Sequence, residues 1–302
     1  MLEGWDMSDA ANAAADTARA AAEEKSALSH PPVDPDATAA YGDDPDQVID
    51  FYVPRAEGAA GRPAPVVAVL HGGAWRAPYD RRHISPFAAF LTRRGFAVAG
   101  IEYRRGAAEA GEGDPVAGRW PDTLDDVAAA VDALPALVRE HLPQADAGRI
   151  VLTGHSAGGH LALWAAARHL LPEDAPWRTD RPAPLRGVVA LAPIADFAVA
   201  DKLEVCGGAV RQFLGGDGKF AERQPYADPA LLVPTGIATT LVQGRRDIDV
   251  PQAVAEAYTV AAAKAGEVVG LTLLEDVGHF PLIDPAADAC AVVAEEIAQL
   301  AW

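Results

Sequence analysis

The residues with the clearest chemical potential lie in the segment Gly154-His155-Ser156-Ala157-Gly158. A serine hydroxyl is a weak nucleophile, and it attacks a carbonyl only when a tight turn exposes it to a base and to the substrate. The run GRIVLT precedes the segment and HLALWAAAR follows it, which predicts a strand, a sharp turn and a helix. We therefore predict that Ser156 is a nucleophile. The alternative is a glycine-rich helix start that only packs or binds phosphate.

A serine nucleophile requires a general base, and His279 has the most suitable place in the sequence. It lies in a loop directly after the run LTLLEDV, and the ends of parallel strands meet at one edge of a sheet. His155 and His160 are too close to Ser156 in the sequence for their rings to face its hydroxyl easily. We predict His279 as the base, although a lone histidine in a loop is usually a surface residue.

The base in turn needs a carboxylate that fixes its tautomer and stabilises the imidazolium. Asp247 follows the run ATTLVQG and is our choice, with Asp249 as the first rival. Asp196, after the run VVALAPI, is a weaker alternative. Asp247 could instead cap a helix or pair with the neighbouring Arg245 and Arg246.

The tetrahedral intermediate of acyl transfer needs hydrogen-bond donors for its oxyanion. The N–H of Ala157, directly after the nucleophile, is one candidate. The run HGGAW that follows the strand-like PVVAVL offers two more, the N–H groups of Gly73 and Ala74. We expect His71 to hold this loop by hydrogen bonds and not to act as a base. An ordinary turn would also use two glycines.

Four aromatic residues flank the predicted loops and are candidate walls of a substrate pocket: Trp75, Tyr79, Trp120 and Phe280. Arg76 or Arg119 could receive a substrate carboxylate. Core packing or surface exposure would explain each of these residues equally well.

Strand-like and helix-like runs alternate from about residue 45 onward. This alternation predicts an α/β fold with a mostly parallel sheet covered by helices on both faces. We expect one catalytic domain at 41–302, with residues 197–236 crossing the carboxyl edge of the sheet. Residues 1–40 form an acidic, alanine-rich N-terminal extension. We expect it to be a solvated helix over 8–27 and then a linker, although it could cap a site.

Composition sets the class of protein. The 302-residue chain carries a formal charge of −18, and residues 1–50 hold twelve acids and two bases, or −10 of that total. Such a charge is repelled by phosphates and anionic lipids, so we expect no nucleic-acid or membrane partner. The start of the chain does not read as a signal peptide and no run is long enough to span a membrane, which predicts a cytoplasmic protein. Cys206 and Cys290 cannot form a disulfide framework and have no metal-ligand spacing.

The order HGG, GHSAGG, Asp, His resembles the α/β-hydrolase superfamily from about residue 41 to the end. The run HGGAW is similar to the HGGxW form of kynurenine formamidases, although that form also occurs among general esterases. Hormone-sensitive-lipase-like esterases usually have a third glycine where this chain has Ala74. The resemblance implies a serine hydrolase with Ser156, Asp247 and His279 as triad. It also implies the α/β-hydrolase fold and no need for a metal or cofactor.

The most specific hypothesis is a kynurenine formamidase that cleaves N-formyl-L-kynurenine in tryptophan catabolism. A carboxylesterase on short-chain acyl esters uses the same machinery and is the alternative. A ligand-binding protein on a retired hydrolase scaffold is the third, and the complete set of catalytic residues argues against it. The expected partner is a small ester or amide, and the sequence leaves a homodimer open.

Overall fold

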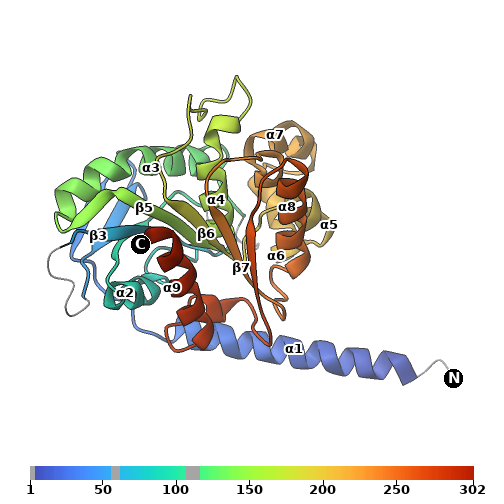
Figure 1. Ribbon diagram of the computed structural model, residues 1–302. Coiled ribbons are helices and arrows are strands. Elements are labelled where there is room, and N and C mark those ends of the chain that lie inside the picture. Colours follow the sequence, from blue (N-terminus) through green and yellow to red (C-terminus); the bar gives the residue numbers. More distant parts are fainter. Residues whose placement is uncertain (1–3, 56–61, 107–115) are drawn as a thin grey trace.

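The computed structural model describes residues 4–55, 62–106 and 116–302. Within them eight strands form one sheet in the order β1-β2-β4-β3-β5-β6-β7-β8 (Figure 1). The strands are β1 (Ala37–Ala40), β2 (Val48–Tyr52), β3 (Ala64–Leu70), β4 (Ala97–Ile101), β5 (Ala145–His155), β6 (Gly187–Leu191), β7 (Thr239–Gly244) and β8 (Gly270–Leu274). At one edge of the sheet, β2 pairs antiparallel with both β1 and β4. All the other neighbouring strands, from β4 through β3 and β5 to β8, pair parallel. The predicted mostly parallel α/β sheet is confirmed.

Helices cover both faces of this sheet, as parallel strands require. The buried side chains of α3 (Asp122–His141), α4 (Ala157–Ala166) and α8 (Gln252–Lys264) pack on one face. Those of α2 (Ser85–Arg93) and α9 (Asp288–Ala301) pack on the other. Every residue of β3, β4 and β6 is buried, which explains why these strands are continuous apolar runs in the sequence.

The segment 197–236 leaves the sheet after β6 and returns before β7. It forms α5 (Phe197–Lys202), α6 (Val205–Phe213) and α7 (Phe220–Ala227), with the short 3₁₀ turns η2 (Asp217–Lys219) and η3 (Pro229–Leu231). A further turn, η1 (Arg168–Leu170), follows α4, and η4 (Phe280–Leu282) follows the loop after β8. Cys206 of α6 lines the same cavity as Ser156, so this excursion supplies a wall at the carboxyl edge of the sheet.

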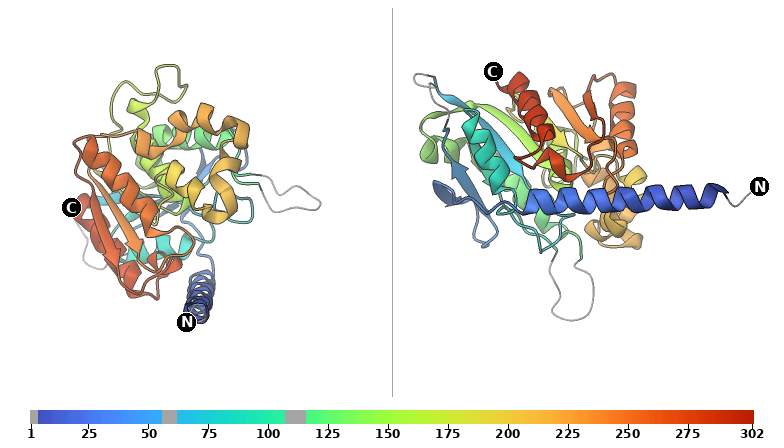
Figure 2. Two further views of the ribbon diagram at one scale, coloured as in Figure 1. Left: turned by 90° about the vertical axis from the view of Figure 1, so that its right-hand side faces the viewer. Right: turned by 90° about the horizontal axis from the view of Figure 1, so that it is seen from below.

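The N-terminal part of the chain differs from our expectation. Helix α1 spans Gly4–Leu28 and is longer than predicted at both ends. Its C-terminal half lies against the body near η4, and its other end projects beyond the body (Figures 1 and 2). The predicted boundary at residue 40 places residues 37–40 in the extension, whereas in the structure they pair with β2 as the edge strand β1. In the described residues no helix has the length and apolar character needed to cross a bilayer.

Candidate active site

Ser156 occupies the turn between β5 and α4. Its backbone has φ 57° and ψ −118°, a conformation that costs a non-glycine residue about 1–3 kcal/mol. The turn is possible only because the strand and the helix approach closely. A Cβ atom on Gly154 would overlap the Gly158 carbonyl, and one on Gly158 would overlap the carbonyl of Leu70 in β3. The two glycines of the motif therefore have a steric reason, and their effect is to present the Ser156 hydroxyl at the edge of the sheet.

We predict that Gly158→Ala destabilises the protein by about 2 kcal/mol or more, because the added methyl group meets rigid backbone. Urea unfolding followed by tryptophan fluorescence measures this change. Gly218→Ala is the matched control, since a Cβ at Gly218 meets nothing within 4 Å. Equal stability of the two variants would contradict the steric account of the turn.

His279 and Asp247 are joined by a short hydrogen bond. The Nδ1 atom of His279 lies 2.7 Å from Oδ2 of Asp247. The other carboxylate oxygen of Asp247 accepts the N–H groups of Asp249 at 2.9 Å and Val250 at 2.8 Å, and Gln243 donates to Oδ2 at 3.2 Å. The carboxylate is thus fixed in place by the loop after β7. Both side chains come from the two loops in which the sequence predicted them.

The carboxylate also sets the protonation of the ring. Burial alone would lower the pKa of His279, but the charge and hydrogen bond of Asp247, together with the charges of Asp249 and Glu23, outweigh it and raise the pKa. The rival acids lie elsewhere. Asp249 lines the cavity without bonding to the His279 ring, and the Asp196 side chain caps α5 by accepting the N–H of Val199 at 2.9 Å.

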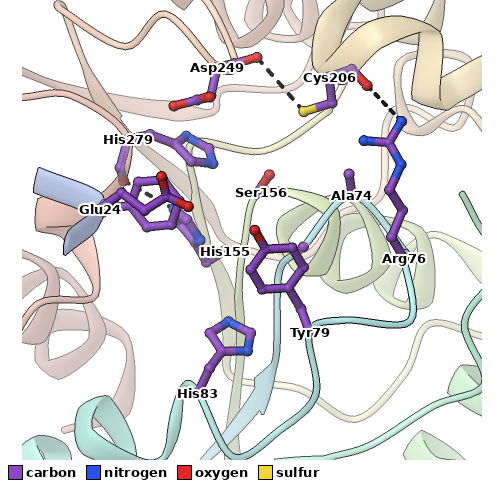
Figure 3. A pocket seen from close by; sticks show the side chains of 12 residues that line it. Glu24, Ala74, Arg76, Tyr79, His83, His155, Ser156, Cys206, Asp249 and His279 are labelled. Atoms are coloured by element: carbon purple, nitrogen blue, oxygen red, sulfur yellow. Dashed lines mark hydrogen bonds between the residues drawn. The ribbon is translucent and has the colours of Figure 1, made fainter. Parts of the chain in front are cut away.

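The Ser156 hydroxyl and the His279 ring line one cavity of about 220 Å³ (Figure 3). No hydrogen bond joins them among the described residues, which is common before substrate tightens a catalytic contact. The cavity is lined by Glu24, Gly73, Ala74, Arg76, Tyr79, His83, His155, Ser156, Cys206, Asp249, His279 and Phe280. The structure therefore brings together the segments that follow β3, β5, β7 and β8.

His155 stands directly beside the predicted base. Its Nε2 atom donates to the carbonyl of His279 at 3.0 Å, and the two ring centres are 4.3 Å apart. Burial and the neighbouring His279 hold the pKa of His155 well below its ordinary value, so the ring is neutral. His155 supports the backbone of His279 and does not compete with it as a base. Its position next to Ser156 is clear in the sequence, but this supporting contact is not.

The loop after β3 presents free backbone donors to the cavity. Gly73, Ala74 and Trp75 all have positive φ values, 101°, 50° and 55°. Within the part of the chain that the structure describes, neither the N–H of Gly73 nor that of Ala74 has a hydrogen-bond acceptor. The N–H of Ala157 lies in the first turn of α4, where an amide has no intrahelical acceptor. Gly73 and Ala74 line the cavity, and Ala157 directly follows Ser156 without being among the lining residues.

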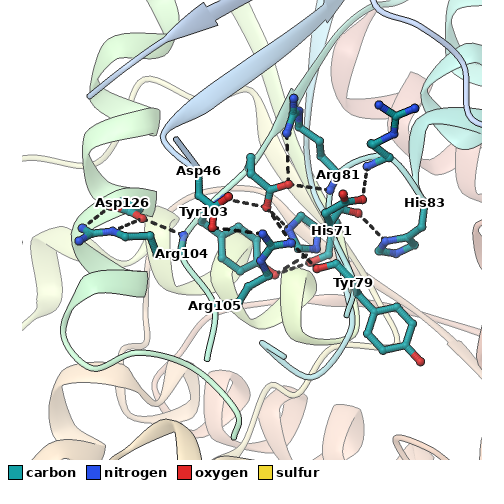
Figure 4. A network of polar contacts seen from close by, with 12 residues as sticks. Asp46, His71, Tyr79, Arg81, His83, Tyr103, Arg104, Arg105 and Asp126 are labelled. Carbon is teal, nitrogen blue, oxygen red and sulfur yellow. Dashed lines mark hydrogen bonds and ion pairs between the residues drawn. The ribbon is translucent and has the colours of Figure 1, made fainter. Parts of the chain in front are cut away.

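A buried polar network holds this loop from below (Figure 4). Nε2 of His71 lies 2.8 Å from Oε1 of Glu102. The backbone carbonyl of His71 accepts a hydrogen bond from the Tyr103 hydroxyl at 2.8 Å. Although burial opposes ionisation, His71 and Arg105 lower the pKa of Glu102 to about 2. Glu102 also accepts the N–H of Arg81 at 2.9 Å. The predicted hydrogen bonds of His71 are thus present, and His71 is not among the residues that line the cavity with Ser156.

The four aromatic residues predicted as pocket walls divide into two pairs. Tyr79 and Phe280 line the cavity with Ser156. Trp75 does not, because it is fully buried and stacks on Phe213 at 4.6 Å. Trp120 lines a separate cavity, edge-on to Trp177. The prediction that these two tryptophans line the substrate pocket is therefore wrong: Trp75 belongs to the core, and Trp120 lines a second cavity.

Of the two arginines predicted to bind a substrate carboxylate, one lines the cavity and the other does not. Arg76 lines it, whereas Arg119 is exposed, pairs with Asp122 and is not among the lining residues. Cys206 is a free cysteine in the lining, and burial raises the pKa of its thiol to about 12. The thiol is protonated near neutrality and is no rival to Ser156 as nucleophile.

Three potential metal ligands, Asp247, Asp249 and His279, lie close together, with ligand atoms within 4.8 Å of one another. Nδ1 of His279 hydrogen-bonds to Oδ2 of Asp247, and Oδ1 of Asp247 accepts two backbone N–H groups. The arrangement is that of a base oriented by a carboxylate.

Sequence comparison places the chain in a family. Residues 49–260, which run from the second residue of β2 through β7 and into α8, match the model of the BD-FAE family. The chain belongs to the BD-FAE family. The match covers Ser156 and Asp247 but ends before the His279 loop. Together with the relatives and the fold described below, this match makes the chain a member of the α/β-hydrolase superfamily.

The relatives of this BD-FAE protein include several enzymes that act on esters. Esterase LipC of Mycobacterium tuberculosis is 31% identical over 146 residues, 47% of this chain and 31% of LipC. A probable isoprenylcysteine alpha-carbonyl methylesterase of Oryza sativa is 27% identical over 79% of this chain and 56% of its own length. The non-reducing polyketide synthase ausA of Aspergillus calidoustus is 34% identical over 42% of this chain and 5% of its own length. The BD-FAE protein thus spans between a twentieth and about half of these relatives.

Solved structures show the same fold. Esterase B of Lactobacillus rhamnosis has a TM-score of 0.71 at 19% identity, and the alignment covers 96% of this chain and 93% of the esterase. A truncated carbohydrate esterase from gut microbiota has a TM-score of 0.66 at 19% identity over 90% of this chain and 99% of its own. At these identities the likeness establishes the fold and nothing finer.

Proposed function

We propose that this protein is a serine carboxylester hydrolase that acts through an acyl-enzyme. The observation that carries the proposal is the Ser156 hydroxyl in one cavity with the His279 ring, whose Nδ1 is 2.7 Å from Asp247. His279 accepts the proton of Ser156 as its oxygen attacks the ester carbonyl, and the imidazolium is stabilised by Asp247. The N–H groups of Gly73, Ala74 and Ala157 donate hydrogen bonds to the negatively charged oxygen that forms from the carbonyl.

The second half of the reaction reverses these roles. The tetrahedral intermediate collapses, His279 gives its proton to the leaving alcohol, and the acyl group stays on Ser156. Water then attacks the acyl-enzyme with His279 as base, releases the acid and restores the serine. His279 carries out every proton transfer of the reaction, and the neighbouring Asp247 carboxylate contributes to its raised pKa.

Two experiments test the proposal. The purified protein should hydrolyse p-nitrophenyl butyrate, and a fluorophosphonate probe should label one residue, Ser156, as shown by peptide mass spectrometry. Absence of both ester turnover and labelling would favour the ligand-binding scaffold instead.

The cavity size predicts the length of the acyl chain. About 220 Å³ is below the 300–1,000 Å³ typical of sites for drug-sized ligands, so a short acyl group fits and a long one does not. We expect kcat/KM to be at least about 10-fold higher for p-nitrophenyl acetate or butyrate than for the octanoate, because unburied methylenes gain no binding energy. A kcat/KM that rises from butyrate to octanoate would contradict the limit that we derive from the cavity volume.

A formamide is the second candidate substrate. Its support is the HGGAW loop together with Tyr79, Phe280 and Arg76 in the lining, which suit an aryl group and a carboxylate. The catalytic steps would be the same, with an amine leaving in place of an alcohol. Side-by-side turnover of N-formyl-L-kynurenine and p-nitrophenyl acetate tests it, and turnover of the ester alone would reject the formamidase. Esters are preferred because named relatives are esterases.

A further inference from the structure

One side chain of the cavity has no part in the mechanism above. Glu24 belongs to α1, which is far from the catalytic motifs in the sequence, yet its carboxylate lines the cavity near the His279 ring (Figure 3). In the ranges 4–55, 62–106 and 116–302 it has no hydrogen-bond or ion-pair partner. A carboxylate that is held at a cavity wall without a protein partner is available to a ligand.

The position of Glu24 is fixed by its neighbours on the same helix. The next residue toward the N-terminus, Glu23, accepts the N–H of Gly278 at 3.2 Å, directly before His279. One turn further along the chain, the Ser26 hydroxyl donates to Asp284 at 2.6 Å, and His30 lies 2.8 Å from the other oxygen of Asp284. These contacts attach α1 to the segment that carries the base.

The burial pattern supports the same docking. Between 12 and 28 the less exposed positions of α1 are 16, 19, 20, 23, 24 and 27. Their spacing of three or four residues is that of one helical face. Arg19, on this face, also donates to the Arg246 carbonyl at 2.6 Å. The expectation of a solvated helix is therefore wrong for this face, and docking of the face directs Glu24 into the cavity.

The charges around the cavity favour a cation. Asp249 is a second carboxyl group in the lining, and like Glu24 it would attract a positively charged group in the cavity. Among the described lining residues Arg76 is the only arginine or lysine. Its guanidinium keeps its charge, donates to the Cys206 carbonyl at 2.8 Å and to Gln212 at 3.4 Å, and lies across the cavity from Glu24 (Figure 3). The chain as a whole carries −18, which attracts cations toward the opening.

We propose that Glu24 is a specificity-determining residue through which the N-terminal helix selects esters that carry a cationic group. The inference rests on the proposed ester hydrolysis and deepens it by naming a substrate class. Glu24 acts on binding of the cationic part of the substrate and takes no proton in the reaction. Its removal lowers kcat/KM for a cationic ester and leaves an uncharged ester of the same shape nearly unaffected.

The test uses two esters that differ only in charge, butyrylcholine and its uncharged isostere 3,3-dimethylbutyl butyrate, with acid release followed in a pH-stat. We expect the wild-type protein to prefer the cationic ester by about fivefold or more in kcat/KM at low salt. Glu24→Gln should lower this ratio by about fivefold, and Glu24→Lys should bring it below one. The preference should shrink as salt is raised, because the attraction is partly screened.

Glu295→Gln is the matched control, since Glu295 is an exposed residue of α9 outside the cavity lining and its substitution removes the same charge. The ratio within each variant is independent of the fraction of folded enzyme. An unchanged ratio in Glu24→Gln, or an equal change in Glu295→Gln, overturns the inference while ester hydrolysis stands. If the wild type hydrolyses neither these esters nor p-nitrophenyl butyrate, the proposed function itself fails and the inference falls with it.

Discussion

Replacing Ser156 with alanine is expected to lower kcat for p-nitrophenyl butyrate by about 10⁴-fold, because no other described side chain in the cavity can form the acyl-enzyme. The Cys206 thiol is protonated, with its pKa raised to about 12, and the His155 ring is bonded to the His279 carbonyl. Steady-state kinetics and the loss of fluorophosphonate labelling measure the effect. Alanine tolerates φ 57° no better than serine does, so the thermal unfolding temperature should hardly change.

Ser156→Gly separates catalysis from stability at the same position. It removes the hydroxyl equally, so activity should fall as far as in the alanine variant. Glycine adopts positive φ without penalty, so this variant should be more stable by about 1 kcal/mol, or a few degrees in thermal unfolding. An active-site serine that is strained by its turn predicts this combination. If either variant kept more than about a hundredth of the wild-type turnover, the nucleophile would have to be sought elsewhere.

The central sheet could be predicted from the sequence because its strands are buried on both faces. The runs that form β3, β4 and β6 contain only residues that end up buried, so an uninterrupted apolar run identifies each strand. β1 was missed for the opposite reason. It is a four-residue edge strand in which half-buried and exposed positions alternate, and it follows a proline-rich stretch.

The segments that carry Ser156, His279 and the two rival aspartates could be located from the sequence. Parallel strands bring their carboxyl ends to one edge, so residues directly after β5, β7 and β8 meet regardless of their separation in sequence. The choice between Asp247 and Asp249 required the coordinates, because both stand in the same loop. Only Asp247 accepts two backbone N–H groups on one oxygen and bonds to His279 with the other.

Glu24 could not be found in the same way. Helix α1 is rich in alanine and acidic residues on every side, so its sequence does not mark one face as apolar. Docking depends on polar contacts with partners more than two hundred residues away, such as Gly278 and Asp284. The prediction for Trp75 was wrong because the sequence does not tell a buried aromatic that supports a loop from one that lines a pocket, and Trp75 is fully buried.

The two aspartates after β7 should respond very differently to conversion to asparagine. Asp247→Asn is expected to lower kcat by about 10³–10⁴-fold, whereas Asp249→Asn should cost less than about 10-fold. An asparagine at 247 can still accept the N–H groups of Asp249 and Val250 through its carbonyl, so the loop should stay folded. Its amide group would then face Nδ1 of His279 as a donor, which favours the wrong tautomer of the ring and removes the charge that stabilises the imidazolium.

The pH dependence supplies an independent readout of the same pair. His279 must be neutral to accept the serine proton, so activity falls as the pH drops through its pKa, which in the wild type lies above the ordinary value near 6.5. Without the Asp247 charge, burial lowers the pKa of His279, and the acid limb of kcat/KM should move to lower pH in the residual activity of Asp247→Asn. Asp249 raises the same pKa less strongly, so its variant should show a smaller shift in the same direction. The opposite ranking of the two variants would make Asp249 the acid and require the loop to rearrange when substrate binds.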